Sequence, residues 1–294
     1  MNLAGVHSVL YALFDRHGHL DRDAMRAQVK LMLAQGIDGI TVLGLATEGP
    51  KLNPDEQCDV IRWAAEDVAG IVPYSATISG NSVTAQRKMI QYCLDHNVDW
   101  LILQPPSTGS YAGDVYLDYF LEVADGFDAV FSIQNAPQYL GRGLTSQDIG
   151  KLTSQNPNFS VIKAESSAVD FAHLIANCGN KLQVLNGRGG LELTDCLRAG
   201  AQGFILAPDA IDFTKKAYDH WVAGEFEKAE KVYAHALPAI VFMMQSLEHL
   251  ICYGKRIFGL RAGIEIYDRS PSLLPTEFGL RSAQYWADYL GKYE

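Results

Sequence analysis

Short apolar runs alternate along this chain with amphipathic stretches, and this alternation constrains the fold more than any other feature. Strands that alternate with helices pair in parallel through βαβ units. Eight such units over about 210 residues predict a closed (β/α)8 TIM barrel. The expected strands are Val6–Leu13, Gly39–Gly44, Ile71–Ile78, Trp100–Gln104, Ala129–Gln134, Ser160–Ala164, Leu182–Asn186 and Gly203–Ala207. The expected helices between them are Asp23–Gln35, Pro54–Val68, Ser82–His96, Val115–Gly126, Ser146–Gln155, Val169–Asn177 and Gly190–Ala199.

A doubly wound open sheet is the alternative fold that the same alternation allows. That fold usually has a glycine-rich turn after its first strand, whereas residues 14–19 read Phe-Asp-Arg-His-Gly-His. We therefore expect residues 1–212 to form the barrel. Residues 213–294 continue with helical spacing, and no linker rich in Pro, Gly or Ser precedes them. We expect them to form a C-terminal helical extension that packs on the barrel, and not an independent domain, with helices at Phe213–Ala223, Phe226–Gln245, Leu247–Phe258 and Ser282–Leu290.

Charge and cysteine content narrow the classes of partner and the compartment. The formal net charge is −10 and no basic cluster stands out, so nucleic acid and anionic membranes are poor partners. No apolar run approaches the roughly 20 residues of a membrane span, and the N-terminus has no basic segment followed by an apolar one. The five cysteines include no CxxC pair. These features predict a cytoplasmic protein with reduced thiols.

Lys163 is the first residue to consider as catalytic, because it ends the apolar run of the sixth expected strand. In barrels of this type the chemistry gathers at the C-terminal ends of the strands. Burial lowers the pKa of a lysine and frees its lone pair, and such an amine attacks a ketone to form a Schiff base. The alternative is a lysine that reaches solvent over its own aliphatic stem.

Glu165 and Gln134 lie where they could assist this amine. Glu165 follows Lys163 by two residues on a strand, so both side chains point to the same face. Its carboxylate either pairs with the ammonium and shuttles protons, or satisfies Arg188 or a backbone donor. Gln134, at the end of the fifth strand, either hydrogen-bonds a substrate oxygen or is a buried amide satisfied by backbone.

Two loops at strand ends are candidates for binding an anion. The small-residue loop after the second strand includes Ala46, Thr47 and Glu48 and precedes a strong helix start at residues 53–56. Its backbone N–H groups either face a substrate carboxylate or belong to a tight turn. The glycine-rich segment Asn186–Gly190 either holds phosphate, with Arg188 as its partner, or is a flexible turn.

The histidines show no spacing typical of a metal site. His17 and His19 flank a glycine in a polar turn, and His249 has no ligand partner in its helical stretch. We therefore expect no metal, and a metal-dependent aldolase is disfavoured. The sequence also contains no nucleophile elbow and no GxGxxG motif.

Taken in order, these segments resemble the dihydrodipicolinate synthase / N-acetylneuraminate lyase family. The resemblance runs from about Gly5 to Gly259 and is carried by the first strand and loop (residues 5–21), a GxTGE-type loop (residues 36–52), Gln134-Asn135-Ala136-Pro137, Ile162-Lys163, and Gly187, Gly200 and Gly203. It implies a (β/α)8 barrel with a C-terminal helical extension. It also implies class I lyase chemistry on pyruvate or another 2-oxo acid, Lys163 as the Schiff-base lysine, no metal or organic cofactor, and a homo-oligomer, tetramer or dimer.

The chain departs from that family at five positions. Leu45-Ala46 replaces the Thr-Thr or Ser-Thr pair that binds the carboxylate, Gln134 replaces the tyrosine of Tyr-Asn-x-Pro, Ser107 replaces the tyrosine after the fourth strand, and Tyr139 replaces an arginine, although Arg142 is close by. The family's threonine and two tyrosines relay protons, and an amide has no useful pKa for this task. We therefore expect a divergent member that is not an authentic dihydrodipicolinate synthase. Its proton carrier would be Glu48, Glu165, Tyr111, Tyr139 or a water.

The function expected from these observations is a lyase, either an aldolase or a dehydratase/deaminase, that acts on a pyruvate-like 2-oxo acid through a Lys163 Schiff base. Two alternatives are a barrel enzyme that binds a sugar phosphate without imine chemistry, and a non-catalytic ligand-binding descendant. The expected catalytic residues are Lys163, Gln134 and Glu165. The residues expected to bind substrate are Ala46, Thr47, Glu48, Ser107, Tyr139 and Arg188.

Overall fold

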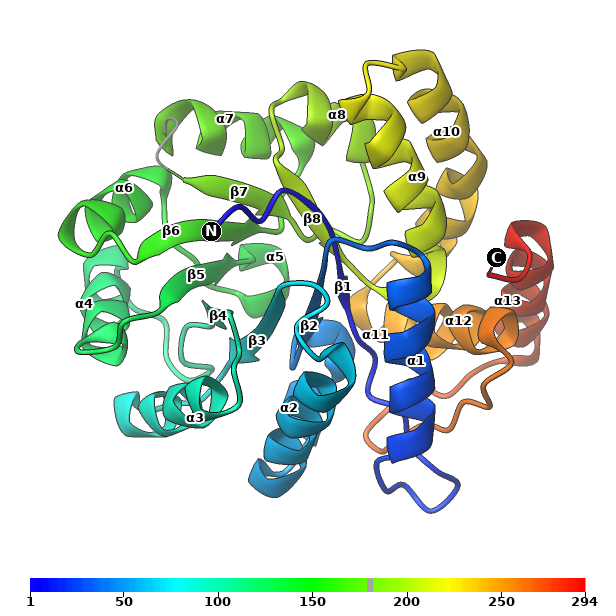
Figure 1. Cartoon of the computed structure of the whole chain (residues 1–294), viewed down its shortest axis with the longest axis horizontal. Coiled ribbons are helices and arrows are strands. Elements are labelled where there is room, and N and C mark those ends of the chain that lie inside the picture. The colour runs from blue at the N-terminus through cyan, green and yellow to red at the C-terminus, as the bar shows by residue number, and fades with distance from the viewer. Residues whose placement is uncertain (179–181, 294) are drawn as a thin grey trace.

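The computed structural model describes residues 1–178 and 182–293 and has the predicted fold, a closed barrel of eight parallel strands paired in chain order (Figure 1). The strands are β1 (Gly5–Val9), β2 (Gly39–Val42), β3 (Tyr74–Ile78), β4 (Trp100–Leu103), β5 (Val130–Asn135), β6 (Phe159–Ala164), β7 (Gln183–Asn186) and β8 (Gly203–Leu206). Pairing of β1 with β8 closes the ring. The carboxyl ends of all eight strands therefore open at one end of the barrel, where barrel enzymes place their chemistry.

Helices on the outside of the barrel cover the strands (Figure 1). They are α1 (Arg22–Ala34), α2 (Pro54–Val68), α3 (Val83–Asp95), α4 (Gly113–Ala124), α6 (Ser146–Gln155), α7 (Ala168–Cys178) and α8 (Leu193–Arg198), with a short α5 (Pro137–Leu140) after β5. The predicted bounds of α2 are confirmed. Asn53 caps this helix, since its side chain accepts from the Glu56 N–H while Glu56 accepts from the Asn53 N–H.

Several elements are shorter than predicted, and two of them are shorter for clear local reasons. The first strand ends at Val9 rather than Leu13 because the Tyr11 N–H donates to the side chain of Gln28 at 3.0 Å instead of to a neighbouring strand. Helix α8 begins at Leu193 rather than Gly190 because Gly189, Gly190 and Glu192 have φ values of 63°, 86° and 54°. A right-handed helix cannot include such residues.

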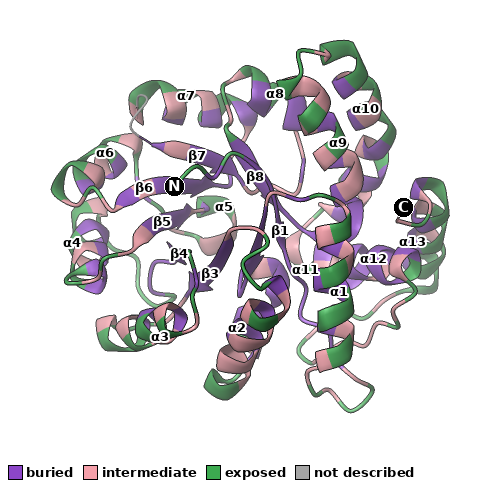
Figure 2. Cartoon of the chain, viewed as in Figure 1, coloured by how far each residue is buried: buried purple, intermediate pink, exposed green. Residues whose placement is uncertain are grey.

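The barrel strands are buried almost throughout (Figure 2). Each outer helix buries the side that faces the strands, as its hydrophobic spacing predicts. Several polar residues are nevertheless buried on the strands, among them His7, Thr41, Ser75 and Ser132. Thr41 and Ser75 satisfy each other through a hydroxyl–hydroxyl hydrogen bond of 2.7 Å.

The C-terminal helices continue around the barrel and return to its mouth. They are α9 (Ile211–Val222), α10 (Phe226–Met243), α11 (Leu247–His249), a π-helical segment (Leu250–Gly254), α12 (Lys255–Ala262) and α13 (Glu277–Leu290). Helix α9 follows β8 and contacts β1, so it completes the ring of barrel helices. The single helix predicted over Leu247–Phe258 is interrupted by the π-helical turn. The division of the chain at residue 212 stays a prediction.

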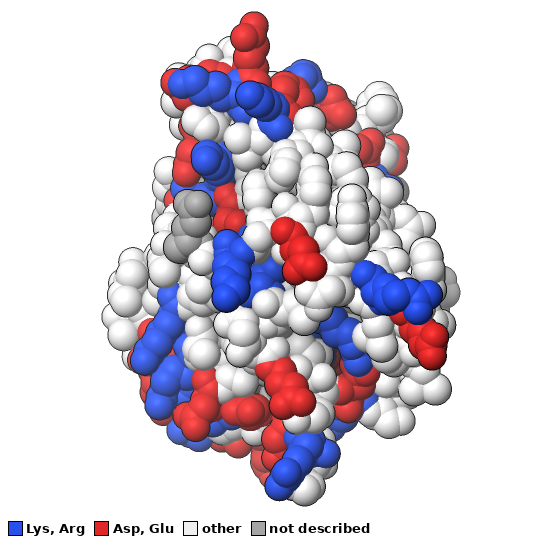
Figure 3. Space-filling view, turned by 90° about the vertical axis from the view of Figure 1, so that its right-hand side faces the viewer, with Lys and Arg blue, Asp and Glu red and all other residues white. Residues whose placement is uncertain are grey.

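Charged side chains of both signs are mixed over the face that carries the C-terminal helices, next to a wide uncharged area (Figure 3). Ion pairs such as Arg256–Asp268 account for part of this mixing. That face therefore presents no continuous basic surface of the kind that binds nucleic acid. In the described part of the chain, a membrane-spanning length of apolar residues occurs in no single helix; α10 and residues 247–262 reach it only as a pair, bent by 103°.

Candidate active site

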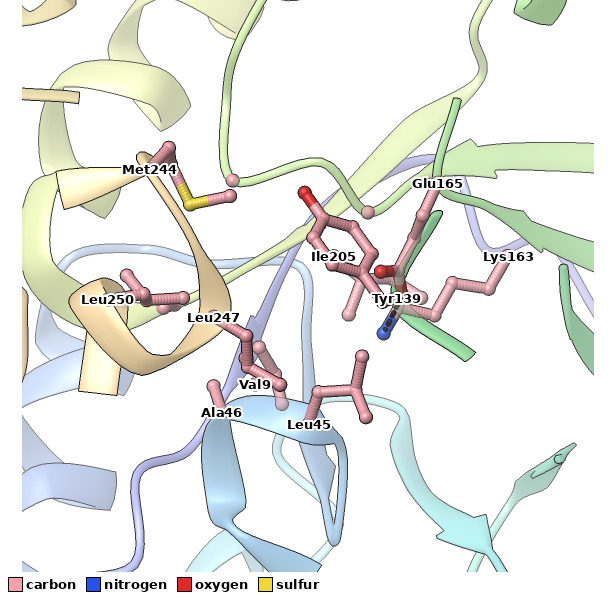
Figure 4. A pocket seen from close by; sticks show the side chains of 13 residues that line it. Val9, Leu45, Ala46, Tyr139, Lys163, Glu165, Ile205, Met244, Leu247 and Leu250 are labelled. Atoms are coloured by element: carbon pink, nitrogen blue, oxygen red, sulfur yellow. Dashed lines mark ion pairs between the residues drawn. The ribbon is translucent and has the colours of Figure 1, made fainter. Parts of the chain in front are cut away.

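Lys163 lies on β6 near the mouth of the barrel, and its amine points into a pocket (Figure 4). Its neighbours in the sheet are Gln134 on β5 and Leu185 on β7. The residue is only 3% exposed. Lys163 therefore does not reach bulk solvent over its stem, and the reading of it as a surface lysine is wrong.

Glu165 is the ionic partner of Lys163. Its Oε1 lies 2.8 Å from Lys163 Nζ, and both side chains are nearly inaccessible to solvent. Figure 4 marks this ion pair at the edge of the pocket. Of the alternatives that the sequence left open for Glu165, the structure shows the ion pair with the lysine and no contact with Arg188.

Two glutamines extend this ion pair into a buried polar chain. Gln134 Nε2 donates to Glu165 Oε1 at 2.5 Å, and Gln104 Nε2 donates to Gln134 Oε1 at 2.7 Å. Gln138 donates to the backbone carbonyl of Glu165 at 3.0 Å. The Gln134 amide thus binds the same carboxylate oxygen that faces the amine, and so holds the Glu165 side chain in place. Sequence reasoning missed Gln104, although its place at the end of the fourth strand was a usable signal.

Gly187, directly after β7, leaves the room that the lysine needs. A Cβ at this position would lie 2.7 Å from Lys163 Cε and 2.9 Å from Glu165 Cγ. Real Cβ atoms do not approach other atoms this closely, so any larger residue would displace the ion pair. The glycine at the end of the seventh strand is therefore explained by the close approach of the Lys163 and Glu165 side chains, and a phosphate-binding loop is not needed to explain it.

The remainder of the pocket is largely aliphatic. Its polar side chains are Tyr139, Lys163 and Glu165, which lie together on one side in Figure 4. The other lining residues are Val9, Leu45, Ala46, Gly187, Gly189, Ile205, Ala207, Met244, Leu247 and Leu250. Three of these, Met244, Leu247 and Leu250, come from the C-terminal helical segment, and no motif in the sequence pointed to them. The pocket thus offers one ion pair and one phenol to a ligand.

Tyr139 keeps its proton at neutral pH. Burial raises the pKa of its hydroxyl and the negative charge of Glu165 raises it further, while Arg188 opposes both effects. A protonated phenol beside Lys163 is a hydrogen-bond donor for a substrate oxygen. Tyr139 therefore lies where the sequence analysis expected a substrate-binding residue.

Arg188 lies beside this pocket but does not line it. Its guanidinium pairs with the Glu192 carboxylate, and its backbone N–H donates to Asn186 Oδ1 at 2.9 Å. Its Nε is buried and has no partner among the described residues. The arginine thus acts on the pocket through its charge and through a side-chain hydrogen bond to Tyr139.

The loop after β2 contributes Ala46 to the pocket but uses Thr47 and Glu48 within the fold. The Thr47 hydroxyl donates to the Leu10 carbonyl at 2.6 Å. The amides of Thr47 and Glu48 donate to the carbonyls of Gly44 and Leu45, both at 3.0 Å. Neither amide is therefore available to an anion.

The Glu48 side chain is also occupied. It pairs with Lys51 at 2.5 Å and with Lys255, and both Glu48 and Lys255 are almost fully buried. Lys255 Nζ donates further to the Ala12 carbonyl at 3.1 Å. These contacts connect the loop after β2 to α12. Glu48 therefore stabilises the fold, and it does not line the pocket beside Lys163.

Ser107 and Tyr111 lie in an exposed loop that does not line the pocket. The Ser107 N–H and hydroxyl both donate to Asn81 Oδ1, at 2.8 and 2.6 Å. The Tyr111 ring packs edge-on against Tyr116. Arg142 donates to the Pro106 carbonyl at 2.5 Å and so holds this loop.

The described residues contain no group of three or more His, Cys, Asp or Glu side chains that could hold a metal ion.

Solved structures with the same fold cover nearly the whole chain. The structure of a putative dihydrodipicolinate synthetase from Pseudomonas aeruginosa is 22% identical, with a TM-score of 0.91 over 98% of this chain and 99% of that one. The structure of YagE from E. coli K12 in complex with pyruvate is 20% identical, with a TM-score of 0.92 over 99% of both chains. At this identity the likeness establishes the fold.

Together with a match to a known family, the barrel and the buried lysine define the class of this protein. It is an enzyme, a lyase of the class I aldolase type. The chain belongs to the Dihydrodipicolinate synthetase family, whose model matches residues 2–271. It is 25% identical over 244 residues to a 4-hydroxy-tetrahydrodipicolinate synthase of Methanococcus maripaludis, covering 82% of this chain and 83% of that protein. A second synthase, from Oleidesulfovibrio alaskensis, is 27% identical over 173 residues, or 58% of this chain and 59% of that one.

Proposed function

We propose that this lyase forms a Schiff base between Lys163 and the C2 carbonyl of a pyruvate-like 2-oxo acid, and that Glu165 carries the protons. The observation that carries the proposal is the 2.8 Å contact between Lys163 Nζ and Glu165 Oε1 inside the pocket. A general base must lie within hydrogen-bond reach of the proton it takes. Glu165 meets this condition.

The protons balance along this route. The ammonium of Lys163 gives one proton to the Glu165 carboxylate and becomes a neutral amine, which attacks C2. A second N–H proton passes from the attacking nitrogen to the carbonyl oxygen, which becomes the carbinolamine hydroxyl, and the proton on Glu165 then lets this hydroxyl leave as water. The product is a protonated imine beside a carboxylate, so the pair of opposite charges persists from start to end.

The protonated imine accepts electrons from a bond at C3. Cleavage of C3–C4 is a retro-aldol reaction, and loss of a C4 substituent after C3 deprotonation is a dehydration or deamination. Both reactions pass through the same imine, so both remain within the proposal. Tyr139 would donate to a substrate oxygen, Gln134 would hold Glu165 in place, and the Ala46 N–H would face the carboxylate.

The departures at Leu45, Ser107 and Gln134 support a reaction other than that of the synthase relatives. In the structure the two glutamines occupy the neighbourhood of the amine with an amide chain that carries no ionisable group. The proton relay is thereby left to Glu165.

We also propose a homo-oligomer, tetramer or dimer, as the resemblance implies, although one solved relative is described as a monomeric variant. The five free cysteines support a cytoplasmic location.

A sugar-phosphate enzyme is the weaker alternative, because Arg188 is already paired with Glu192.

Borohydride reduction in the presence of pyruvate tests the proposal. We expect a mass gain located on Lys163 by peptide mapping, and no gain in a folded Lys163→Ala variant. An adduct on a different lysine, or full turnover by Lys163→Ala on every 2-oxo acid it accepts, would refute the mechanism.

A further inference from the structure

The space beside Lys163 is much smaller than the groove that adjoins it. The pocket has a volume of about 40 Å³ and the neighbouring groove about 390 Å³. Pockets that enclose a whole small ligand usually measure about 300–1,000 Å³. The pocket at the amine is thus too small to enclose a larger ligand, and any extended part of the substrate has to lie outside it.

The groove, here named the outer groove, lies next to the pocket. Leu45 and Leu247 line both spaces, so the two adjoin at these side chains. Its apolar lining residues are Leu45, Pro50, Leu247, Ile251, Pro271 and Leu273. A substrate that extends past Leu45 and Leu247 would therefore meet hydrocarbon on the sides that these residues form.

The charges in the outer groove do not favour an anionic tail. Lys51 is its cationic side chain, and it is already bound to Glu48 at 2.5 Å and to the Arg269 carbonyl at 3.3 Å. Glu248 also lines the groove; hydrogen bonds from its own backbone N–H and from Ser246 keep the pKa of its carboxyl below the usual range. An ionised Glu248 repels a second carboxylate.

We propose that the outer groove binds the hydrocarbon tail of the substrate, which is thus a 2-oxo acid with an uncharged aliphatic chain. This inference rests on the proposed function, since the keto head is taken to sit at Lys163. It follows from the small inner space, the two shared leucines and the absence of a free cation among the charged residues that line the groove.

Chain length is the variable to test. Borohydride trapping on Lys163 would be titrated with pyruvate, 2-oxohexanoate, 2-oxooctanoate and the anionic 2-oxoadipate. Each buried methylene is expected to improve the half-saturating concentration about fourfold until the groove is filled. We expect 2-oxooctanoate to saturate at a concentration at least tenfold below pyruvate and 2-oxoadipate. Equal saturation by all four acids, or a preference for 2-oxoadipate, would overturn the inference.

Two adjacent leucines provide a matched pair of variants. Leu273 lines the outer groove and is 42% exposed, whereas Leu274 is 79% exposed and does not line it. Leu273→Asp should reduce the advantage of 2-oxooctanoate over pyruvate at least tenfold. Leu274→Asp should leave it unchanged, because the same charge is then placed outside the groove. Equal effects of the two substitutions would overturn the inference.

A measurement that needs no imine separates this inference from the proposed function. Calorimetry measures the binding of 2-hydroxyoctanoate and of lactate without imine formation, because a 2-hydroxy acid has no carbonyl to attack. The difference between the two affinities reports the contribution of the tail. Tighter binding of 2-hydroxyoctanoate that Leu273→Asp removes supports the groove, even if no acid is trapped on Lys163. Trapping on Lys163 together with equal binding of both hydroxy acids would support the Schiff base and overturn the groove.

Discussion

Glu165 Oε1 lies 2.8 Å from Lys163 Nζ, at the point where β6 leaves the barrel. Two residues of separation on a strand place both side chains on one face, and Gln134, in register with Lys163 on β5, donates to the same oxygen. One carboxylate oxygen therefore meets both the amine and a fixed amide. A substitution of any of these residues should therefore change the reactivity of the Lys163 amine.

Glu165→Gln should slow imine formation by about 10²–10⁴-fold, the usual contribution of a positioned acid or base. The amide preserves the shape of the side chain but cannot take the proton from Lys163. The rate of borohydride-trappable imine, followed by rapid quench, measures this loss. Glu122→Gln, an exposed residue of α4, is the control for the substitution itself. Imine formation by Glu165→Gln at the unmodified rate would assign the protons to another group.

Gln134→Leu should lower the free energy of unfolding by about 1–3 kcal/mol, because it leaves the buried Gln104 amide unsatisfied. It should also slow imine formation, since the Glu165 oxygen that faces the amine is then no longer held by the Gln134 amide. Urea titration and the rate of borohydride-trappable imine are the two measurements. Gln104→Leu removes the same buried hydrogen bond without touching Glu165. It should match the loss of stability and leave the rate of imine formation unchanged; an equal loss of rate in both variants would argue against a positioning role for Gln134.

Gly187→Ala should lower the rate of imine formation about 100-fold, because its methyl would lie 2.7 Å from Lys163 Cε and push the amine out of position. Gly150→Ala is the matched control: it lies within α6 with nothing within 4 Å of the added methyl. That change should stabilise the protein by about 0.5–1 kcal/mol and leave the rate unchanged. Retained activity in Gly187→Ala would mean that the lysine has room the structure does not show.

The barrel could be predicted from the sequence because its elements follow local rules. The strands are apolar runs of the right length, and helices such as α2 carry a cap, a proline at the first position and a buried stripe. The boundaries that differ do so through tertiary contacts or backbone conformation. The Tyr11 N–H turns to Gln28, and the glycines before α8 take positive φ values.

The site could be predicted where its residues lie at or just after the ends of strands, as Lys163, Gln134, Ala46 and Tyr139 do. Lys163 and Glu165 are two apart, so their common face could be read directly. Leu247 and Leu250 come from the C-terminal helical segment and reach the pocket through tertiary packing, which no local pattern encodes. The roles expected of Thr47 and Glu48 depended on free amides and a free carboxylate, and the fold uses all three.

Asp209 makes the stability of the barrel depend on pH. Complete burial raises the pKa of its carboxyl, although the Tyr11 hydroxyl, which donates to it at 2.6 Å, opposes the shift. The folded state thus binds this proton more tightly than the unfolded state, in which the pKa is about 3.9. The contribution to stability is therefore fully present below about pH 3.9 and is lost as the pH rises through the raised value.

Asp209→Asn removes this titration. Relative to the variant, the unmodified protein should lose free energy of unfolding as the pH rises from about 3.9 through the raised pKa. Urea titrations of both proteins at a series of pH values measure the difference, and Asp118→Asn, at an exposed position of α4, controls for removal of one negative charge. Because an amide is not ionised at any of these pH values, a constant difference between Asp209→Asn and the unmodified protein would show that the buried carboxyl does not titrate in this window.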